Sequence, residues 1–254
     1  MQGQFGKVVK IIENDKIMAL KTIKKLKEET RLLRFAGKQY NENSKDQNFL
    51  FHMEIDALTE INKLKSSYFA EFYKYKEDGN YYYIYTSFIP GKTLLTKITK
   101  QNEIVGNFKI LKEICEIFIL LAKHEIVYLD FNKNNFIIDD DNSNVTLVDF
   151  GFNCGKEHIK SCSNYIFKRL YGENVNFDML YNHMLYRAIS LCVDVYSFVD
   201  PRYHHDVYEE MFKNIPAKTA NKANIYYKTL DAEEKLEILE DFRNIFEKYE
   251  HEIF

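Results

Sequence analysis

The chain of 254 residues contains no tryptophan and only four cysteines. Cys115, Cys154, Cys162 and Cys192 form no CxxC pair and no Cys/His spacing typical of metal ligands, so no zinc site is predicted. No signal peptide precedes them, and we therefore expect reduced thiols and a cytoplasmic location.

The charge balance and the length of the apolar runs exclude several classes of protein. The 35 basic and 38 acidic residues leave a net charge of -3, which excludes a disordered acidic protein and gives no electrostatic reason to expect nucleic acid or a membrane surface as a partner. The longest apolar stretch, Ile114 to Ala122, includes Glu116 and falls far short of the ~20 residues of a membrane span. Hydrophobic residues at 46% supply core material for one body or for two lobes that share a cleft.

The first third of the chain has the pattern of β-hairpins around one helix. Runs rich in β-branched and aromatic residues flank Asn14-Asp15 and the turn at 77–80, and they predict strands at 7–13, 16–23, 69–75 and 81–87. Residues 24–48 are polar and charged, which favours a surface insertion or an extra short helix. From about Asn48, apolar residues recur every three or four positions and predict an amphipathic helix.

Pro90-Gly91 interrupts this pattern and is the expected boundary between lobes at 1–89 and 90–254. Beyond it the sequence is mostly helical, and the spacing of apolar residues predicts a buried helix over 108–124. Short strands are expected at 136–138 and 145–148, and Asp231 is a predicted N-cap of the last helix.

Two clusters in the first lobe suggest contacts with phosphates. The glycines of Gly3-Gln4-Phe5-Gly6-Lys7-Val8 would let the backbone close over an anion, although an ordinary glycine turn would look the same. Lys21 ends the apolar run Met18-Ala19-Leu20-Lys21. Buried, its ammonium needs an anion as partner; alternatively its side chain extends to the edge of the sheet.

Two clusters in the second lobe carry short oxygen-bearing side chains. They are Tyr128-Leu129-Asp130-Phe131-Asn132-Lys133-Asn134-Asn135 and Asp149-Phe150-Gly151. In phosphoryl transfer, one carboxylate can orient a hydroxyl nucleophile, while an amide oxygen and a second carboxylate hold magnesium. Asp-Phe-Gly alone is a common turn sequence, so the prediction of phosphoryl transfer depends on the clusters occurring together.

The order of the four clusters resembles that of the protein kinase superfamily. The resemblance implies an α+β, bilobal fold with a small antiparallel sheet and one main helix in the N-terminal lobe and a reduced, mostly helical C-terminal lobe. It also implies ATP and Mg²⁺ as cofactors.

The resemblance implies a role for individual residues. Gly3, Gly6 and Val8 would belong to the glycine-rich loop over ATP, Ala19 and Lys21 to the strand that carries the phosphate-binding lysine, and Glu54 would pair with Lys21. Glu60 stays open as an alternative to Glu54. Tyr85 would be the gatekeeper, and the backbone of Thr86 and Phe88 would meet the adenine edge. Asp130 would be the catalytic aspartate, with Asn135 and Asp149 as magnesium ligands.

Several positions depart from the family pattern. Met1 stands where the first glycine of the loop is expected, so either the lobe is trimmed or the sequence begins late. Leu129 replaces the arginine that pairs with a phosphorylated activation segment, which predicts no dependence on such phosphorylation. Tyr128 replaces histidine. Asn132 replaces the lysine that neutralises the transferring phosphoryl, and the neighbouring Lys133 is a candidate for that role.

The resemblance weakens after Gly151, where no Ala-Pro-Glu segment shapes a peptide groove. Asp194 resembles the aspartate at the start of the central helix of the C-terminal lobe, and Asp178 is an equal candidate. We therefore expect an ATP- and magnesium-dependent phosphotransferase that acts on a hydroxyl and favour protein serine or threonine as acceptor. The alternatives are a kinase of a small molecule (sugar, lipid or antibiotic-like) and a pseudokinase that binds or scaffolds; the sequence indicates no oligomeric state.

Overall fold

The computed structural model describes residues 2–3, 6–27, 31–35, 38–42, 44–99, 107–141, 143–151, 153–155, 167–168, 171–198, 204–213 and 226–251. Contacts divide the chain into two compact units. The first unit comprises Met1–Ile89, Tyr128–Asp130 and Val148–Asn176; the second comprises Pro90–Val127, Phe131–Leu147 and Phe177–Phe254. The division into lobes at 1–89 and 90–254 stays a prediction.

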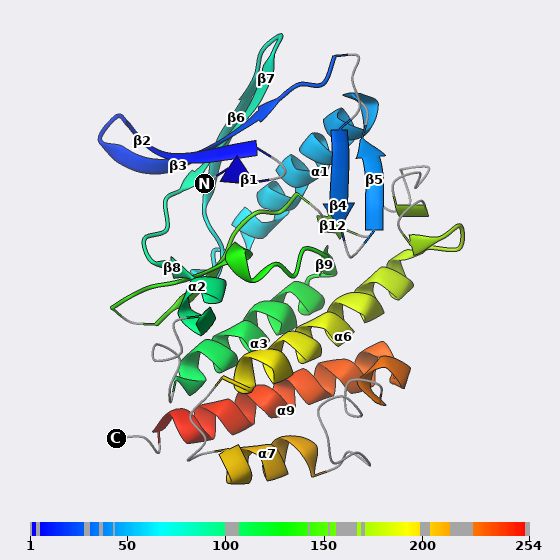
Figure 1. The fold of residues 1–254 in the computed structure, drawn as a ribbon. Coiled ribbons are helices and arrows are strands. Elements are labelled where there is room, and N and C mark those ends of the chain that lie inside the picture. The colour runs from blue at the N-terminus through cyan, green and yellow to red at the C-terminus, as the bar shows by residue number, and fades with distance from the viewer. Residues whose placement is uncertain are drawn as a thin grey trace. The chain divides into compact units, whose positions relative to one another are not determined.

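An antiparallel sheet of five strands forms much of the first unit, in the order β1-β2-β3-β7-β6 (Figure 1). The strands are β1 (Gln2–Gly3), β2 (Gly6–Glu13), β3 (Lys16–Lys24), β6 (Phe72–Glu77) and β7 (Tyr81–Ser87). The predicted hairpin around Asn14-Asp15 is present: both turn residues have positive φ, 51° and 60°, as a two-residue turn between twisted strands requires.

The second predicted hairpin, β6–β7, begins three residues later than expected. Phe69 and Ala70 are buried ahead of the strand, which starts at Phe72. The turn is fixed by Asp78, whose Oδ1 accepts hydrogen bonds of 2.7 Å from the backbone N–H groups of both Asn80 and Tyr81.

The segment 24–48, expected to be a surface insertion or an extra short helix, contains no helix among the residues described before Ser44. It contains a hairpin, β4 (Arg31–Phe35) and β5 (Lys38–Glu42), that pairs Phe35 with Lys38. The two intervening positions, one of them a glycine, lie outside the described residues, and such a short glycine-containing connection favours a hairpin. The following helix, α1, spans Ser44–Lys63 and so begins four residues before Asn48.

Helix α1 packs on the sheet of its own unit through the predicted apolar face. Phe51, Leu58 and Ile61 are each no more than 3% exposed. Phe51 stacks on Tyr82 of β7 with ring centroids 4.2 Å apart. This packing fixes which side of β3 and β7 faces the helix.

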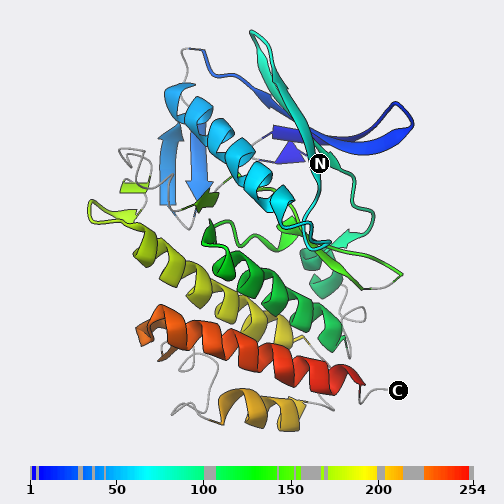
Figure 2. The ribbon, with the colours of Figure 1, turned by 180° about the vertical axis from the view of Figure 1, so that it is seen from behind.

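The second unit is built on three long helices that run side by side, α3 (Phe108–Lys123), α6 (Phe177–Tyr196) and α9 (Ala232–His251) (Figures 1 and 2). Helix α7 (His204–Phe212) lies along α9, where the Tyr249 hydroxyl donates to Glu210 Oε1 over 3.1 Å. The predicted N-cap of α9 is present as a reciprocal pair of 2.9 Å hydrogen bonds between Asp231 and Glu234.

A small sheet and two short helical segments near it also belong to the second unit. Strands β8 (Lys92–Thr93), β10 (Phe136–Ile138) and β11 (Val145–Leu147) pair in the order β11-β10-β8, which confirms both predicted strands. Helix α2 (Leu94–Thr99) follows β8, and a single 3₁₀ turn, η1 (Lys133–Asn135), precedes β10. Gly91 has φ +132°, and a Cβ there would lie 2.2 Å from the Ile138 carbonyl oxygen, so this position requires glycine.

The prediction that Asp194 starts a helix is wrong. Helix α6 begins at Phe177 and ends at Tyr196, which places Asp178 in its first turn and Asp194 in its last turn. The apolar positions between them continue without a break, so no boundary separates two helices. The remaining strands are β9 (Ile126–Tyr128) and β12 (Asn153–Gly155). Among the described helices, none combines the length and apolar character that a membrane span needs.

Candidate active site

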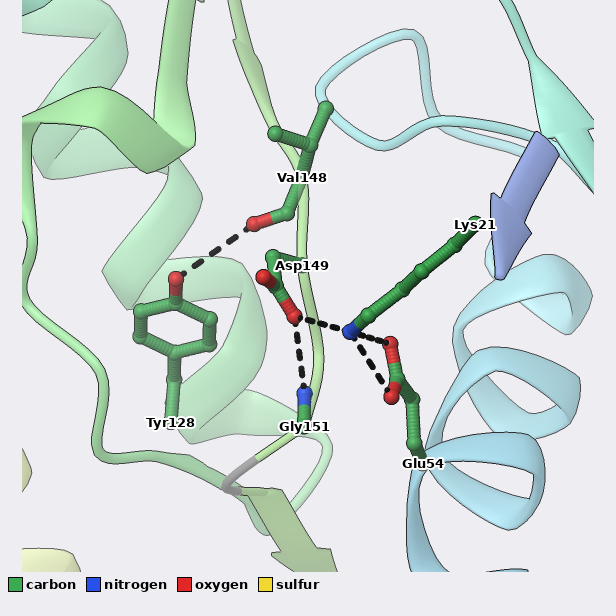
Figure 3. Close-up of polar contacts among 6 residues, drawn as sticks. All are labelled: Lys21, Glu54, Tyr128, Val148, Asp149 and Gly151. Atoms are coloured by element: carbon green, nitrogen blue, oxygen red, sulfur yellow. Dashed lines mark hydrogen bonds and ion pairs between the residues drawn. The ribbon is translucent and has the colours of Figure 1, made fainter. Parts of the chain in front are cut away.

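Lys21 of β3 lies at the centre of a buried charge cluster in the first unit (Figure 3). Lys21 is 8% exposed, and its Nζ donates hydrogen bonds of 2.8 and 2.9 Å to the two carboxylate oxygens of Glu54. A third bond of 2.7 Å runs from Nζ to Oδ1 of Asp149. Residues from a strand, a helix and the 149–151 motif therefore meet at one ammonium group.

The structure selects Glu54 over Glu60 as the partner of Lys21. Glu54 lies on the buried face of α1 and is 4% exposed. Glu60 pairs instead with Lys63 at the surface, at 2.6 Å. Lys21 therefore pairs with Glu54 across 33 positions of the chain.

Burial and neighbouring charge act in opposite directions on this cluster. Burial disfavours the charged form of Lys21, but the carboxylates of Asp149 and Glu54 outweigh it and raise the pKa of Lys21. Burial raises the pKa of Glu54 to about 7, against the favourable effect of Lys21 and with a further increase from Asp149. Lys21 is therefore charged at all physiological pH values, while Glu54 titrates near neutrality.

Asp149 adopts a left-handed backbone conformation with φ 62°, which costs energy for a residue with a Cβ and is tolerated best by Asp and Asn. Its Oδ1 also accepts a hydrogen bond of 3.4 Å from the Gly151 backbone N–H (Figure 3). All its hydrogen bonds within the described residues go to Oδ1. The other oxygen is thus the one available to a ligand.

Phe150 and Tyr128 hold the 149–151 motif in place. Phe150 is 1% exposed and makes edge contacts with Phe69 and Tyr128, with centroids 6.0 and 5.6 Å away. The Tyr128 hydroxyl donates to the carbonyl oxygen of Val148 over 3.4 Å (Figure 3). Tyr128 therefore both packs and hydrogen-bonds beside the motif.

Strand register decides which residues share a face of the sheet with Lys21. Directly paired residues point to the same side, and Lys21 pairs with Val8 and Ile84. Ala19, two positions before Lys21, pairs with Thr86. Val8, Ala19 and Thr86 therefore lie on the face of Lys21.

Tyr85 lies on the opposite face, contrary to its assignment as gatekeeper. It pairs with Leu20 and Lys74, and the ammonium groups of Lys74 and Lys76 lie 4.7 and 5.8 Å from its ring centroid. The physical reason is the two-residue period of a strand: an assignment one position out changes the face. Thr86 takes its place on the face of Lys21.

Gly3 and Gly6 pair with each other across the β1–β2 hairpin. Gly6 has φ +138°, and a Cβ there would lie 2.5 Å from the Thr22 carbonyl oxygen. Gly6 thus permits both the conformation and the close approach of β2 to β3. Phe88 follows β7, with the Lys10 ammonium 4.8 Å from its ring centroid.

In the second unit, η1 shapes the segment that carries Asn135. The Asn132 side chain accepts a 3.0 Å hydrogen bond from the Asn134 N–H, and the Asn132 carbonyl accepts one of 2.8 Å from the Asn135 N–H. Asn135 is 7% exposed. Asn132 is thus the N-cap of this turn.

A model of the protein kinase domain matches residues 2–197 of the chain. The chain belongs to the protein kinase family. It is 30% identical over 182 residues to a serine/threonine-protein kinase, CBK1, of Pneumocystis carinii, a match that covers 69% of this chain and 31% of that protein.

Two kinases of Dictyostelium discoideum are similar over shorter segments. Dual specificity protein kinase zak2 is 31% identical over 106 residues, which cover 42% of this chain and 15% of the relative. Dual specificity protein kinase zakA is 28% identical over 97 residues, which cover 36% and 12%. The chain therefore matches less than a third of the length of each of these three kinases.

The departures of this chain from the family pattern have structural counterparts. Leu129, in place of arginine, is 5% exposed and so belongs to the core. Asp130 follows it and is half-buried in the first unit. Lys133 forms an ion pair with Asp194 in the last turn of α6, and its ammonium lies 6.0 Å from the Phe198 ring centroid.

The sequence did not reveal the contact between Lys21 and Asp149, since 128 positions separate them. It also did not reveal the partner of Lys133. The alternation of Ile84, Tyr85 and Thr86 did contain a signal for the face of Thr86. Successive side chains of a strand point to opposite faces, so if the apolar Ile84 faces the helix, Tyr85 faces away from it and Thr86 faces it again.

Proposed function

We propose that this kinase family member is an ATP- and Mg²⁺-dependent phosphotransferase that transfers the γ-phosphoryl group to a protein serine or threonine hydroxyl. The observation that carries the proposal is the buried Lys21 held by Glu54 and Asp149. The three N–H groups of this ammonium now go to carboxylate oxygens, so a phosphate oxygen would replace one of these acceptors while Glu54 keeps the lysine in position.

The donor atoms fit magnesium. Asp149 and Asn135 offer a carboxylate and an amide oxygen, the hard ligands that this ion prefers, and magnesium is commonly held by one or two carboxylates together with phosphates. When bound, the ion would neutralise charge on the phosphates. Asp149 would hold it through Oδ2, while Oδ1 keeps its hydrogen bond from the Gly151 N–H.

The residues of the chain would divide the work as follows. Lys21 contacts the α and β phosphates, with Glu54 fixing its ammonium. Gly3 and Gly6 let the hairpin backbone approach the phosphates, and Val8, Ala19 and Thr86 supply the face of the sheet on which the nucleotide rests. The backbone that follows Thr86, at Phe88, would meet the adenine edge, and Asp130 would orient the acceptor hydroxyl.

The nature of the relatives favours a protein acceptor over a small molecule, because all three are named as protein kinases. One observation favours a second candidate, a nucleotide-binding pseudokinase. Asn132 caps the η1 turn, and the ammonium of Lys133 is paired with Asp194. Neither residue therefore offers an unpaired positive charge that would stabilise the transferring phosphoryl group.

Turnover of ATP with a generic protein acceptor separates the two candidates. We expect wild type to transfer phosphate and Asp130→Ala to lose about 100-fold or more in kcat, the usual contribution of a positioned acid–base group. Nucleotide binding, measured by the thermal shift with Mg-ATP, should persist in this variant. Binding without any turnover in wild type would establish the pseudokinase.

The metal assignment has its own test. Asp149→Asn keeps the shape of the side chain but removes its charge, so we expect the magnesium concentration for half-maximal turnover to rise at least about 10-fold. Asn244→Asp, a charge change on helix α9 of the second unit, is the control. An unchanged magnesium dependence in Asp149→Asn would remove Asp149 from the ligand set.

A further inference from the structure

Helix α1 carries a side-chain amide near its start that binds the backbone beyond β3. The Gln47 Oε1 accepts a 2.8 Å hydrogen bond from the Leu26 N–H, and its Nε2 donates to the Lys24 carbonyl over 2.9 Å. Gln47 is 3% exposed. One carboxamide thus satisfies both a backbone donor and a backbone acceptor of the chain that leaves β3.

The last turn of the same helix repeats this arrangement on another strand. The Asn62 Oδ1 accepts a 2.9 Å hydrogen bond from the Phe72 N–H, and its Nδ2 donates to the Phe72 carbonyl over 2.6 Å. Phe72 is the first residue of β6. We call Gln47 and Asn62 the two amide clamps.

A carboxamide is suited to this task because it offers a donor and an acceptor side by side, as a peptide group does. An apolar side chain of similar size would leave a backbone N–H and a carbonyl without these partners. The apolar face of α1 supplies attraction but little direction, since hydrophobic contact is non-directional. The clamps, by contrast, specify position along and around the helix axis.

Glu54 lies between the two clamps, seven residues after Gln47 and eight before Asn62. Gln47 ties the helix to the end of the strand that carries Lys21, and Asn62 ties it to β6, next to β7 in the same sheet. We propose that Gln47 and Asn62 are positioning residues that hold Glu54 on Lys21. The value of that ion pair for catalysis rests on the proposed function; the positioning itself does not.

The test measures the accessibility of Lys21 directly. Brief acylation of the folded chain with an N-hydroxysuccinimide ester, followed by peptide mass spectrometry, gives a labelling rate for each lysine. In Gln47→Met and in Asn62→Leu we expect the rate at Lys21 to rise about five-fold, the factor that one net hydrogen bond is worth, and more in the double variant.

Internal references separate local release from general loosening. Lys97 and Lys235 are 6% and 1% exposed in the second unit and should keep their slow labelling, while Lys63, with 64% of its side chain exposed, should stay fast. Thr59→Val is the matched control, because among the described residues the Thr59 hydroxyl bonds only to the Ile55 carbonyl of its own helix. It should leave Lys21 unchanged.

Two results would overturn the positioning role. Labelling of Lys21 that stays at the wild-type rate in both clamp variants is one, and an equal rise at Lys97 and Lys235 is the other. Turnover is measured in parallel, and both variants should lose kcat in proportion to Lys21 labelling. If wild type shows no turnover but Lys21 labelling rises in the clamp variants as expected, the proposed function is wrong and the positioning role of the clamps is supported.

Discussion

At the scale of single residues, Lys21 shows how a buried ammonium is tolerated. Desolvation opposes its charge, and two carboxylates from different elements outweigh that cost. The arrangement is asymmetric: Glu54 is almost fully buried, whereas 30% of the Asp149 side chain is exposed. Water and ligands therefore reach the cluster from the side of Asp149.

Glu54 gives a prediction about pH. Its pKa is about 7 in the folded chain against 4.5 for an ordinary glutamate, so the folded state holds this proton more tightly. The stability that this provides is complete below pH 4.5 and is lost as pH rises through about 7. We expect wild type to lose free energy of unfolding over that window relative to Glu54→Gln, as measured by chemical denaturation.

Turnover should change in the opposite direction across the same window, because the ion pair with Lys21 needs ionised Glu54. Wild type should gain kcat as pH rises through about 7, with this limb absent from Glu54→Gln. Parallel stability profiles of the two proteins between pH 4.5 and 7 would contradict the raised pKa.

At the scale of elements, the β3–β7 register makes Thr86 and Tyr85 a decisive pair. Thr86→Met adds bulk on the face of Lys21 and should raise the Kd for Mg-ATP about 10-fold by overpacking. Tyr85→Ala acts on the other face, where it removes contacts with Lys74 and Lys76, and should lower Tm without changing that Kd. Isothermal calorimetry and thermal melts measure both; a Tyr85→Ala effect on Kd as large as that of Thr86→Met would refute the register.

Elements with strong local signals were predictable from the sequence. Asn14-Asp15 predicts a hairpin because both residues tolerate positive φ. The spacing of Phe51, Leu58 and Ile61 predicts a helix. The pairing of Lys21 with Glu54 followed from the order of motifs. These features depend on nearby residues or on a resemblance that spans many positions.

Other features depend on information that local patterns lack. The side of the sheet on which Tyr85 lies depends on a one-residue difference in register. The β4–β5 hairpin depends on a two-residue connection within a polar segment. The family resemblance places Asp194 at the start of a helix, whereas α6 already begins at Phe177 and has Asp194 in its last turn. Contacts of long sequence separation, such as Lys21 with Asp149, need the folded backbone.

At the scale of the whole molecule, the buried Leu129 predicts a kinase that does not require phosphorylation of its activation segment. A leucine in the core offers no cation for a phosphate. We expect phosphatase treatment of the purified chain to change kcat by less than about two-fold, since no ion pair is lost. A kinase carrying arginine at the equivalent position serves as the comparison, and a loss of activity on dephosphorylation would contradict the expectation.

The sharing of one lysine by two acids has a practical consequence for anyone who wants an inactive reagent. Lys21→Met would leave Glu54 and Asp149 facing each other without their counterion, so one of the two carboxylates would take up a proton. The position of helix α1 against the sheet would change as well. Such a protein differs from wild type in shape and charge as well as in chemistry. Asp130→Ala, which spares that lysine, is the cleaner choice for binding studies.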